Sequence, residues 1–196
     1  MSITPEVEAE ETPAQVGPRD RIQHVVNQLA ALFDKAGEFA GITSGDAAAL
    51  RRMREGEVEP AAFWRLAVTV LEPEGLVSSL EAERAWRTII GLMARAASLH
   101  KPSIKLGAAL EIAGCSEARV TRMLDAKGQS LEPALRGLVH QLASQSVKFN
   151  HAELARLVLT EFVPGLRRDW AETRRRVARA YFASTPSKSD TPADPA

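Results

Sequence analysis

The stretch "AALEIAGCSEARVTRMLDA", residues 108–126, holds two segments of helical apolar spacing on either side of a single glycine. Glycine adopts the left-handed turn conformation readily, so Gly114 is expected to end the first helix. Ser116 then stands at the N-cap position of the second helix. We therefore predict a helix, a tight turn and a second helix within these nineteen residues.

The spacing within the second helix assigns its two sides. Val120 and Met123 fall on the side that would face a core, whereas Arg119 and Arg122 fall on the exposed side. The prediction for this helix is one buried apolar edge and one cationic edge.

Two helices joined by a tight turn also occur in helix-turn-helix DNA-binding proteins. Helices that cross so closely need a small residue about one turn before the glycine, and that position holds Leu110. Ala109 would suit it but lies one residue away, about 100° round the helix. The exposed start of the second helix also lacks the amide side chains that read base edges. We favour two packed helices of a bundle and keep the helix-turn-helix regulator, using residues 108–126, as the alternative.

Helical spacing of apolar residues continues through the rest of the chain. The segments with this spacing are 21–36, 45–53, 60–71, 79–99, 131–145, 151–162 and 166–182. Ser130 is expected to cap the helix that follows it, and Asn150 with Glu153 resembles a capping box. No segment alternates apolar and polar residues as hairpin strands do. The sequence predicts an all-α bundle of about eight or nine helices.

Both ends of the chain differ in composition from the middle. Residues 1–18 are rich in glutamate and proline without apolar periodicity, and residues 185–196 are rich in Pro, Ser and Asp. Such segments bury too little apolar surface to order themselves. We expect a disordered acidic tail at 1–18, a helical domain at 19–184 and a second disordered tail at 185–196.

The formal net charge of +0 conceals an uneven distribution. Residues 1–83 contain 15 acids and 7 bases, whereas residues 84–185 contain 17 bases and 8 acids. No acid occurs between Arg84 and Leu110, a stretch that includes Lys101 and Lys105. A basic surface on the second half would suit a polyanion. The alternative is that these bases lie on solvated faces and pair with acids of the first half.

A second basic run lies near the C-terminus, in "RRDWAETRRRVAR". Its arginines are Arg167, Arg168, Arg174, Arg175, Arg176 and Arg179. Two interpretations stay open for this run: a solvated helix face with internal Glu172-to-Arg176 pairing, or contact with phosphates.

Signals for catalysis are weak. The single cysteine, Cys115, excludes an intramolecular disulfide and a cysteine-based metal cage, and its apolar turn predicts a buried, unreactive thiol. The four histidines are spread along the chain, and the glycines form no phosphate-binding loop. We expect no enzymatic activity, no cofactor and no metal. The polar N-terminus and the lack of a long apolar run favour a cytoplasmic protein.

Taken together, the helical segments resemble a known family, CasB, the small subunit of the type I-E CRISPR Cascade complex. The resemblance spans about residues 20–183. Its motifs are "GDAAALRR" (45–52), "AAFWRLA" (61–67), "KLGAALEIAGCSEARVTRMLDA" (105–126) and "LEPALRGLVHQLASQSVKFNHAELARLVL" (131–159). The sequence departs from the family at Lys105, where Ser is common, and at Asn150-His151, where Asp-Trp is usual.

The resemblance implies an all-helical, non-catalytic protein with two lobes, which would divide this chain into 19–100 and 101–184. It implies partners as well: other Cascade subunits, a second copy arranged head to tail, guide RNA, and target and non-target DNA. In the family, the small subunit lines a basic groove along the guide–target duplex and stabilises the displaced strand.

The resemblance and the charge pattern together give the candidate nucleic-acid-binding residues. By resemblance, Arg51 and Arg52 match the family's Arg-Arg pair, and Arg119 and Arg136 match its later basic positions. The residues themselves add the other three: Lys101 and Lys105 from the acid-free stretch, and Arg122 from the exposed helix edge. A third function class stays open, a protein-interaction bundle whose basic face binds acidic partners.

Overall fold

The computed structural model describes residues 17–35, 42–53 and 57–184. The predicted tails therefore lie outside the described residues, except for Gly17 and Pro18, and Pro18 is the first residue of α1. Within the described residues the chain forms nine α-helices and no β-strand, which confirms the all-α prediction. The α-helices are α1 (Pro18–Asp34), α2 (Ser44–Arg52), α3 (Ala61–Leu66), α4 (Leu80–Arg95), α5 (Leu106–Ile112), α6 (Glu117–Asp125), α7 (Leu131–Ser144), α8 (His151–Phe162) and α9 (Trp170–Ser184).

Short irregular helices extend several of these elements. A π-helical turn, Ala67–Leu71, continues α3, and 3₁₀ turns occupy Ala97–Leu99, Gly128–Ser130 and Pro164–Asp169. The apolar segment 60–71, predicted as one helix, is thus an α-helical turn followed by a π-helical one. The helix α8 ends at Phe162, two residues before Pro164, which cannot continue it.

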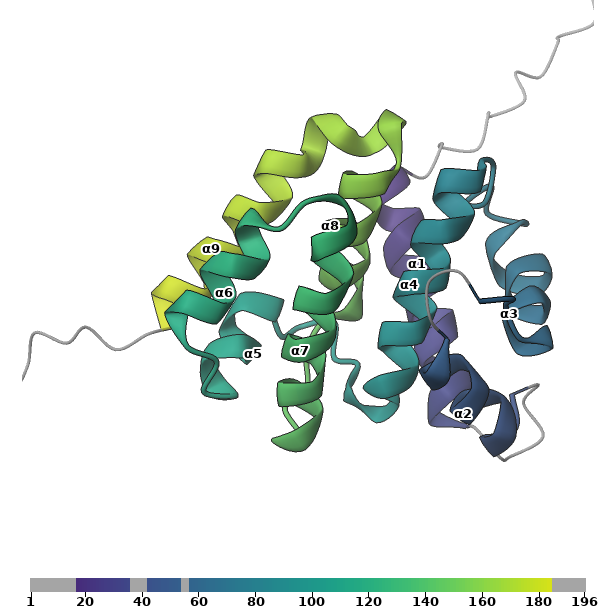
Figure 1. Ribbon diagram of the computed structural model, residues 1–196, viewed down its shortest axis with the longest axis horizontal. Coiled ribbons are helices and arrows are strands. Elements are labelled where there is room, and N and C mark those ends of the chain that lie inside the picture. The colour runs from purple at the N-terminus through teal and green to yellow at the C-terminus, as the bar shows by residue number, and fades with distance from the viewer. Residues whose placement is uncertain (1–16, 36–41, 54–56, 185–196) are drawn as a thin grey trace, which may run out of the picture.

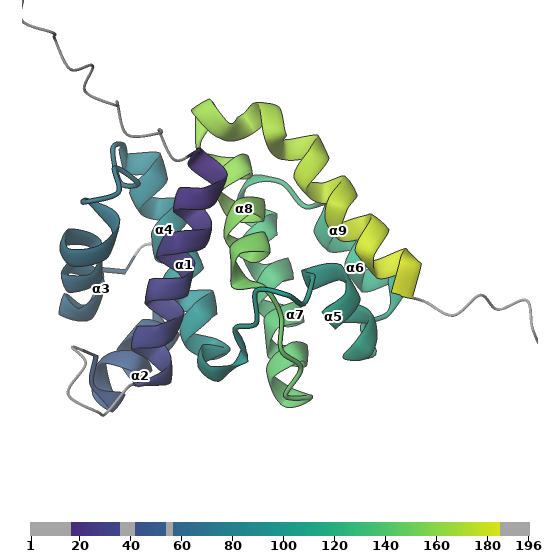
Figure 2. The same cartoon turned by 180° about the vertical axis from the view of Figure 1, so that it is seen from behind.

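The helices divide between two ends of the molecule (Figure 1). The helices α1 to α4 lie at one end, with α3 outermost, and α5, α6 and α9 lie at the other. The helices α6 and α7 face the viewer in Figure 1, whereas α1 and α9 face the viewer from behind (Figure 2). The central helices α4 and α8 pack against each other and join the two ends.

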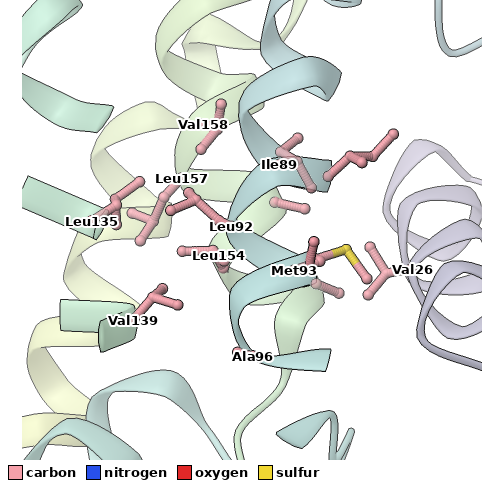
Figure 3. Packing of buried hydrophobic residues seen from close by; sticks show 14 of the residues in the cluster. Val26, Ile89, Leu92, Met93, Ala96, Leu135, Val139, Leu154, Leu157 and Val158 are labelled. Atoms are coloured by element: carbon pink, nitrogen blue, oxygen red, sulfur yellow. The ribbon is translucent and has the colours of Figure 1, made fainter. Parts of the chain in front are cut away.

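The core at this junction is assembled from α1, α4, α7 and α8 (Figure 3). Leu92 of α4 lies among Leu135 of α7 and Leu157 of α8, while Met93 points towards Val26 of α1. All five side chains are almost completely buried. Elements of both predicted lobes therefore share one continuous apolar cluster, and the division into 19–100 and 101–184 stays a prediction.

The helix starts show where local sequence signals act. Thr43 and Asp46 form a reciprocal capping box at α2, and Ser79 accepts a hydrogen bond from Ala82 N at α4. Ser130 and Ser116 stand at the N-cap positions of α7 and α6, as expected, but neither side chain makes a capping hydrogen bond. Ser130 instead exchanges hydrogen bonds with the backbone of Lys127. For both serines, the predicted position is confirmed and the predicted capping bond is wrong.

Candidate nucleic-acid interface

The turn between α5 and α6 sets the direction in which α6 leaves the bundle. Gly114 has a φ of +68°. Its N–H donates to Glu111 O, and Cys115 N–H donates to Leu110 O, which is the Schellman pattern of helix ends. The hydroxyl of Tyr181 in α9 donates to Cys115 O at 2.7 Å and ties the turn to the bundle. Gly114 therefore ends α5 in the way that the sequence predicts.

The helix α6 has the two sides expected from its spacing. Val120 and Met123 are completely buried, and Arg119 and Arg122 are exposed. Arg119 Nη2 donates to Gly137 O of α7 at 3.3 Å, so its guanidinium lies along the α6–α7 contact. Among the described residues, no carboxylate forms an ion pair with either arginine. Both cations are available at the surface.

Arg136 of α7 is half-buried and paired with Glu132 one turn earlier. Glu132 also accepts a hydrogen bond from Thr88 of α4, so this pair lies on the side of α7 that faces α4. Arg95 of α4 lies close enough to Arg136 to be affected by its charge: burial and then the positive charge of Arg136 lower the pKa of Arg95, against an opposing effect of Glu132. Sequence reasoning left Arg95 out of the candidate set, although it belongs to the acid-free stretch after Arg84. The α6–α7 surface is defined here as Arg95, Arg119, Arg122 and Arg136.

Carboxylates also border this surface. Glu117 and Asp125 line an open groove between α6 and the start of α7, together with Arg122. On α4, Arg87 lies 3.9 Å from Glu59 of the first half. The pairing of second-half bases with first-half acids, considered as an alternative from sequence, is therefore realised at Arg87. The α6–α7 surface combines cations with nearby acids rather than forming a uniformly basic track.

Arg51 and Arg52 are exposed in the last turn of α2. The helix α2 packs on α4, and α4 in turn packs on α7. Two helices thus stand between this arginine pair and α6, and Figure 1 shows α2 and α6 towards opposite ends of the molecule. The structure does not bring Arg51 and Arg52 together with Arg119 and Arg122.

Lys101 and Lys105 are also exposed, on the segment that leads into α5. Two backbone hydrogen bonds connect this segment to the start of α8: Lys101 N–H donates to Phe149 O, and Asn150 N–H donates to Ile104 O. Asn150 also exchanges side-chain hydrogen bonds with Gln23 of α1, which faces the viewer in Figure 2. The two lysines therefore belong to the α1 side, away from the α6–α7 surface.

The C-terminal basic run is less uniform than its sequence implies. Arg167, Arg168, Arg175, Arg176 and Arg179 are exposed, but Arg174 is buried. Its guanidinium pairs with Glu161 and bonds to backbone carbonyls at the end of α6. Its helical spacing from Trp170, Val177 and Tyr181 places it on the inward side of α9, a signal that the arginine-rich composition obscured.

Reactive groups outside these cations are few in the described part of the chain. Cys115 is buried as predicted, and burial raises the pKa of its thiol, against a smaller opposing effect of Arg119. Among the described residues, no group of three or more His, Cys, Asp or Glu side chains could hold a metal ion. No helix in this part of the chain is long and apolar enough to span a membrane.

By its fold, the described part of the chain belongs to the class of small all-α proteins, and it presents arginines from two packed helices. The family model for the CRISPR-associated protein Cse2 matches residues 46–182. A crystal structure of a Cse2-family CRISPR-associated protein from Thermus thermophilus has a TM-score of 0.55 and 24% sequence identity, covering 86% of this chain and 99% of that chain. A comparison with the curated proteins gave no match.

The chain belongs to the Cse2 family. It is therefore a CRISPR-associated Cascade subunit, which confirms the CasB family inferred from the sequence motifs. The matched region includes residues 108–126, so the stretch that could have been a helix-turn-helix unit is part of the Cse2 match.

Proposed function

We propose that the chain binds the sugar–phosphate backbone of nucleic acid without reading its sequence. In the Cascade complex it would stabilise the duplex of guide RNA with target DNA, together with the displaced DNA strand. It would contribute no catalysis of its own and act in the cytoplasm. Membership of the Cse2 family supports the proposed action within the Cascade complex, and the α6–α7 surface supports the proposed binding to phosphates.

The observation that carries this proposal is the exposure of Arg119 and Arg122 on α6, which packs against α7, the helix that carries Arg136. Arginine forms planar, two-pronged hydrogen bonds with phosphate oxygens. Phosphate contacts position a protein on nucleic acid but carry no sequence information directly. Replacing a DNA duplex by a duplex of guide RNA and target DNA changes the free energy little. A few additional protein contacts with the backbone are therefore enough to favour the exchange, as in another class of RNA-guided effector.

The test is the salt dependence of binding to labelled single-stranded DNA of two unrelated sequences. We expect similar affinities for both sequences, because phosphates are common to both. The triple variant R119A/R122A/R136A should bind more weakly, with a salt slope smaller by about 0.7 for each phosphate that the variant no longer neutralises.

A matched control removes two exposed cations from the first half of the chain, in the variant K35A/R65A. It should keep the wild-type slope. An unchanged slope in the triple variant contradicts phosphate binding at this surface. Strong preference for one palindromic duplex would instead favour the helix-turn-helix regulator.

We also propose that a second copy of the chain is a partner, arranged head to tail. Trp64 of α3 and Val68 of the π-helical turn that continues it are 43% and 55% exposed, one turn apart. The helix α3 is the outermost element of one end. Phe182 is 47% exposed near the end of α9, which lies at the other end. Exposed apolar side chains at two opposite ends favour a contact between unlike ends of two copies.

A further inference from the structure

Arg174 of α9 is 5% exposed, although it lies in the arginine-rich C-terminal run. Its Nε donates to Leu124 O and its Nη2 donates to Ala126 O, both at 2.8 Å. Its Nη2 also lies 3.2 Å from Glu161 Oε2, and its guanidinium carbon lies 4.0 Å from the centre of the Trp170 ring. One side chain of α9 therefore contacts the end of α6, the last turn of α8 and an aromatic face.

The two carbonyl groups that Arg174 binds belong to the C-terminal end of α6. The last carbonyls of a helix have no partner within the helix and carry its partial negative charge. A guanidinium placed there satisfies two of them and opposes that charge. Removing it would leave the end of α6 without these bonds.

A rigid frame surrounds the guanidinium. Glu161 accepts hydrogen bonds from Gly128 N–H at 2.8 Å and from the indole N–H of Trp170 at 2.6 Å. Burial alone would raise the pKa of Glu161, but these hydrogen bonds and the charge of Arg174 outweigh it and lower that pKa. The carboxylate therefore stays ionised and holds Arg174, Trp170 and the turn after α6 in one arrangement.

The helix α6 depends on such contacts for its orientation. It has nine residues, which is too short to be stable alone. Its described attachments are the buried Val120 and Met123, the bond from Arg119 to Gly137 O, and the bonds from Arg174 to its last turn. Arg122 stands only two residues before Leu124, whose carbonyl Arg174 binds.

We propose that Arg174 is a positioning residue for nucleic-acid binding: it fixes the end of α6 and thereby the orientation of Arg119 and Arg122. It acts through these two arginines and does not contact nucleic acid itself, because its guanidinium is enclosed. This inference rests on the backbone binding proposed above.

The experiment is a double-mutant cycle on the full chain, read as affinity and salt slope for single-stranded DNA. Two variants, Arg174→Gln and Arg174→Lys, are made in the wild type and in the R119A/R122A background. Lysine keeps the charge but lacks the planar fork that reaches several acceptors at once. Far-ultraviolet circular dichroism and the thermal midpoint establish that each variant is folded at the assay temperature.

In the wild-type background, both variants should weaken binding by about fivefold and reduce the salt slope. In the R119A/R122A background, the same variants should have no further effect, because the residues through which Arg174 acts are gone. Arg175→Gln is the matched control: it removes the same charge from an exposed neighbour, and its effect should be equal in both backgrounds.

The outcomes separate the two proposals. If R119A/R122A binds as tightly as wild type, the proposed nucleic-acid surface is wrong. If R119A/R122A binds more weakly but the Arg174 variants retain wild-type affinity while folded, the positioning role is wrong. A loss of equal size in both backgrounds also contradicts it, since that loss would not pass through Arg119 and Arg122.

Discussion

His151 is a polar residue at one of the most enclosed positions of the molecule. Its ring lies 4.4 Å from that of Phe149 and 5.0 Å from that of His100, measured between centroids. Neither ring nitrogen has a hydrogen-bond partner among the described residues. Burial, and then the neighbouring His100, lower the pKa of His151 to about 3. The side chain is therefore a neutral, unsatisfied ring in the core, at a position where the family resemblance implies an aromatic residue.

His151→Phe should stabilise the protein at pH 7 by about 1 kcal/mol, because it removes a buried donor that lacks a partner. The pKa of His151 is about 6.5 in the unfolded chain and lower in the folded chain, so the unfolded state binds more protons as the pH falls below 6.5. The wild type should therefore lose up to about 1.4 kcal/mol per pH unit relative to the variant below that pH.

Urea unfolding of both proteins at pH 7, 6 and 5 measures this difference, and comparison with the variant cancels the carboxylates that both share. A constant gap between wild type and the His151 variant across the three pH values would show that His151 does not carry the pH dependence.

The local sequence predicted which residues stand at helix N-termini better than it predicted which N–H groups their side chains accept from. Asn150 caps α8 as predicted, accepting from Ala152 N–H at 2.9 Å. Glu153, expected to complete the capping box, instead accepts from Leu106 N–H of α5 at 2.6 Å. It thus satisfies the start of a helix distant in sequence. The pattern Asn150 to Glu153 describes only the first turn of α8. The packing of α5 on α8 brings the N–H of Leu106 to Glu153, and the pattern cannot predict this packing.

At the scale of elements, the helices α5 and α9 approach each other closely enough for their backbones to meet at Gly107. A Cβ atom placed on Gly107 would lie 2.1 Å from Val177 O and 2.6 Å from Tyr181 N. The small residue that permits close crossing is therefore Gly107, and the partner helix is α9 rather than α6. The large side chain of Leu110 predicted correctly that α5 does not cross α6 tightly, but the sequence did not predict the close crossing of α5 with α9. Apolar periodicity gives the inward side of a helix and not the helix that it meets.

Gly107→Ala should destabilise the protein by about 3 kcal/mol or more, since the obstacle is backbone that cannot rotate away. The matched control is Gly137→Ala on α7, where the nearest atom would lie 3.8 Å from the new Cβ. That change should be neutral or stabilise by about 0.5 kcal/mol, because alanine favours helix over glycine. Urea unfolding of both variants measures the difference, and equal stabilities would show that α5 and α9 separate at low cost.

At the scale of the whole molecule, the apolar cluster and the charged residues are distributed differently. The cluster is continuous from α1 through α4 and α8 to α7, so the two ends are held together as one folded body. The charge is not divided between an acidic end and a basic end, because α4 lies at the same end as α1 to α3 (Figure 1). Its Arg84, Arg87 and Arg95 balance the formal charge of −3 on the described residues up to Glu83. The charge count along the sequence therefore does not give the charge of either end. The placement of Lys101 and Lys105 on the α1 side could not be predicted, since it depends on bonds to Phe149 and Asn150.

The head-to-tail contact proposed above predicts that W64S/V68S weakens self-association. Both side chains are exposed, so their loss should change the free energy of unfolding by no more than about 0.5 kcal/mol each. Sedimentation velocity across a concentration series measures the association. Leu80→Ser removes a comparably exposed apolar side chain, at the start of α4, and should associate as the wild type does. If W64S/V68S associates as strongly as the wild type, or the wild type stays monomeric across that series, the end that carries α3 is not the contact between copies.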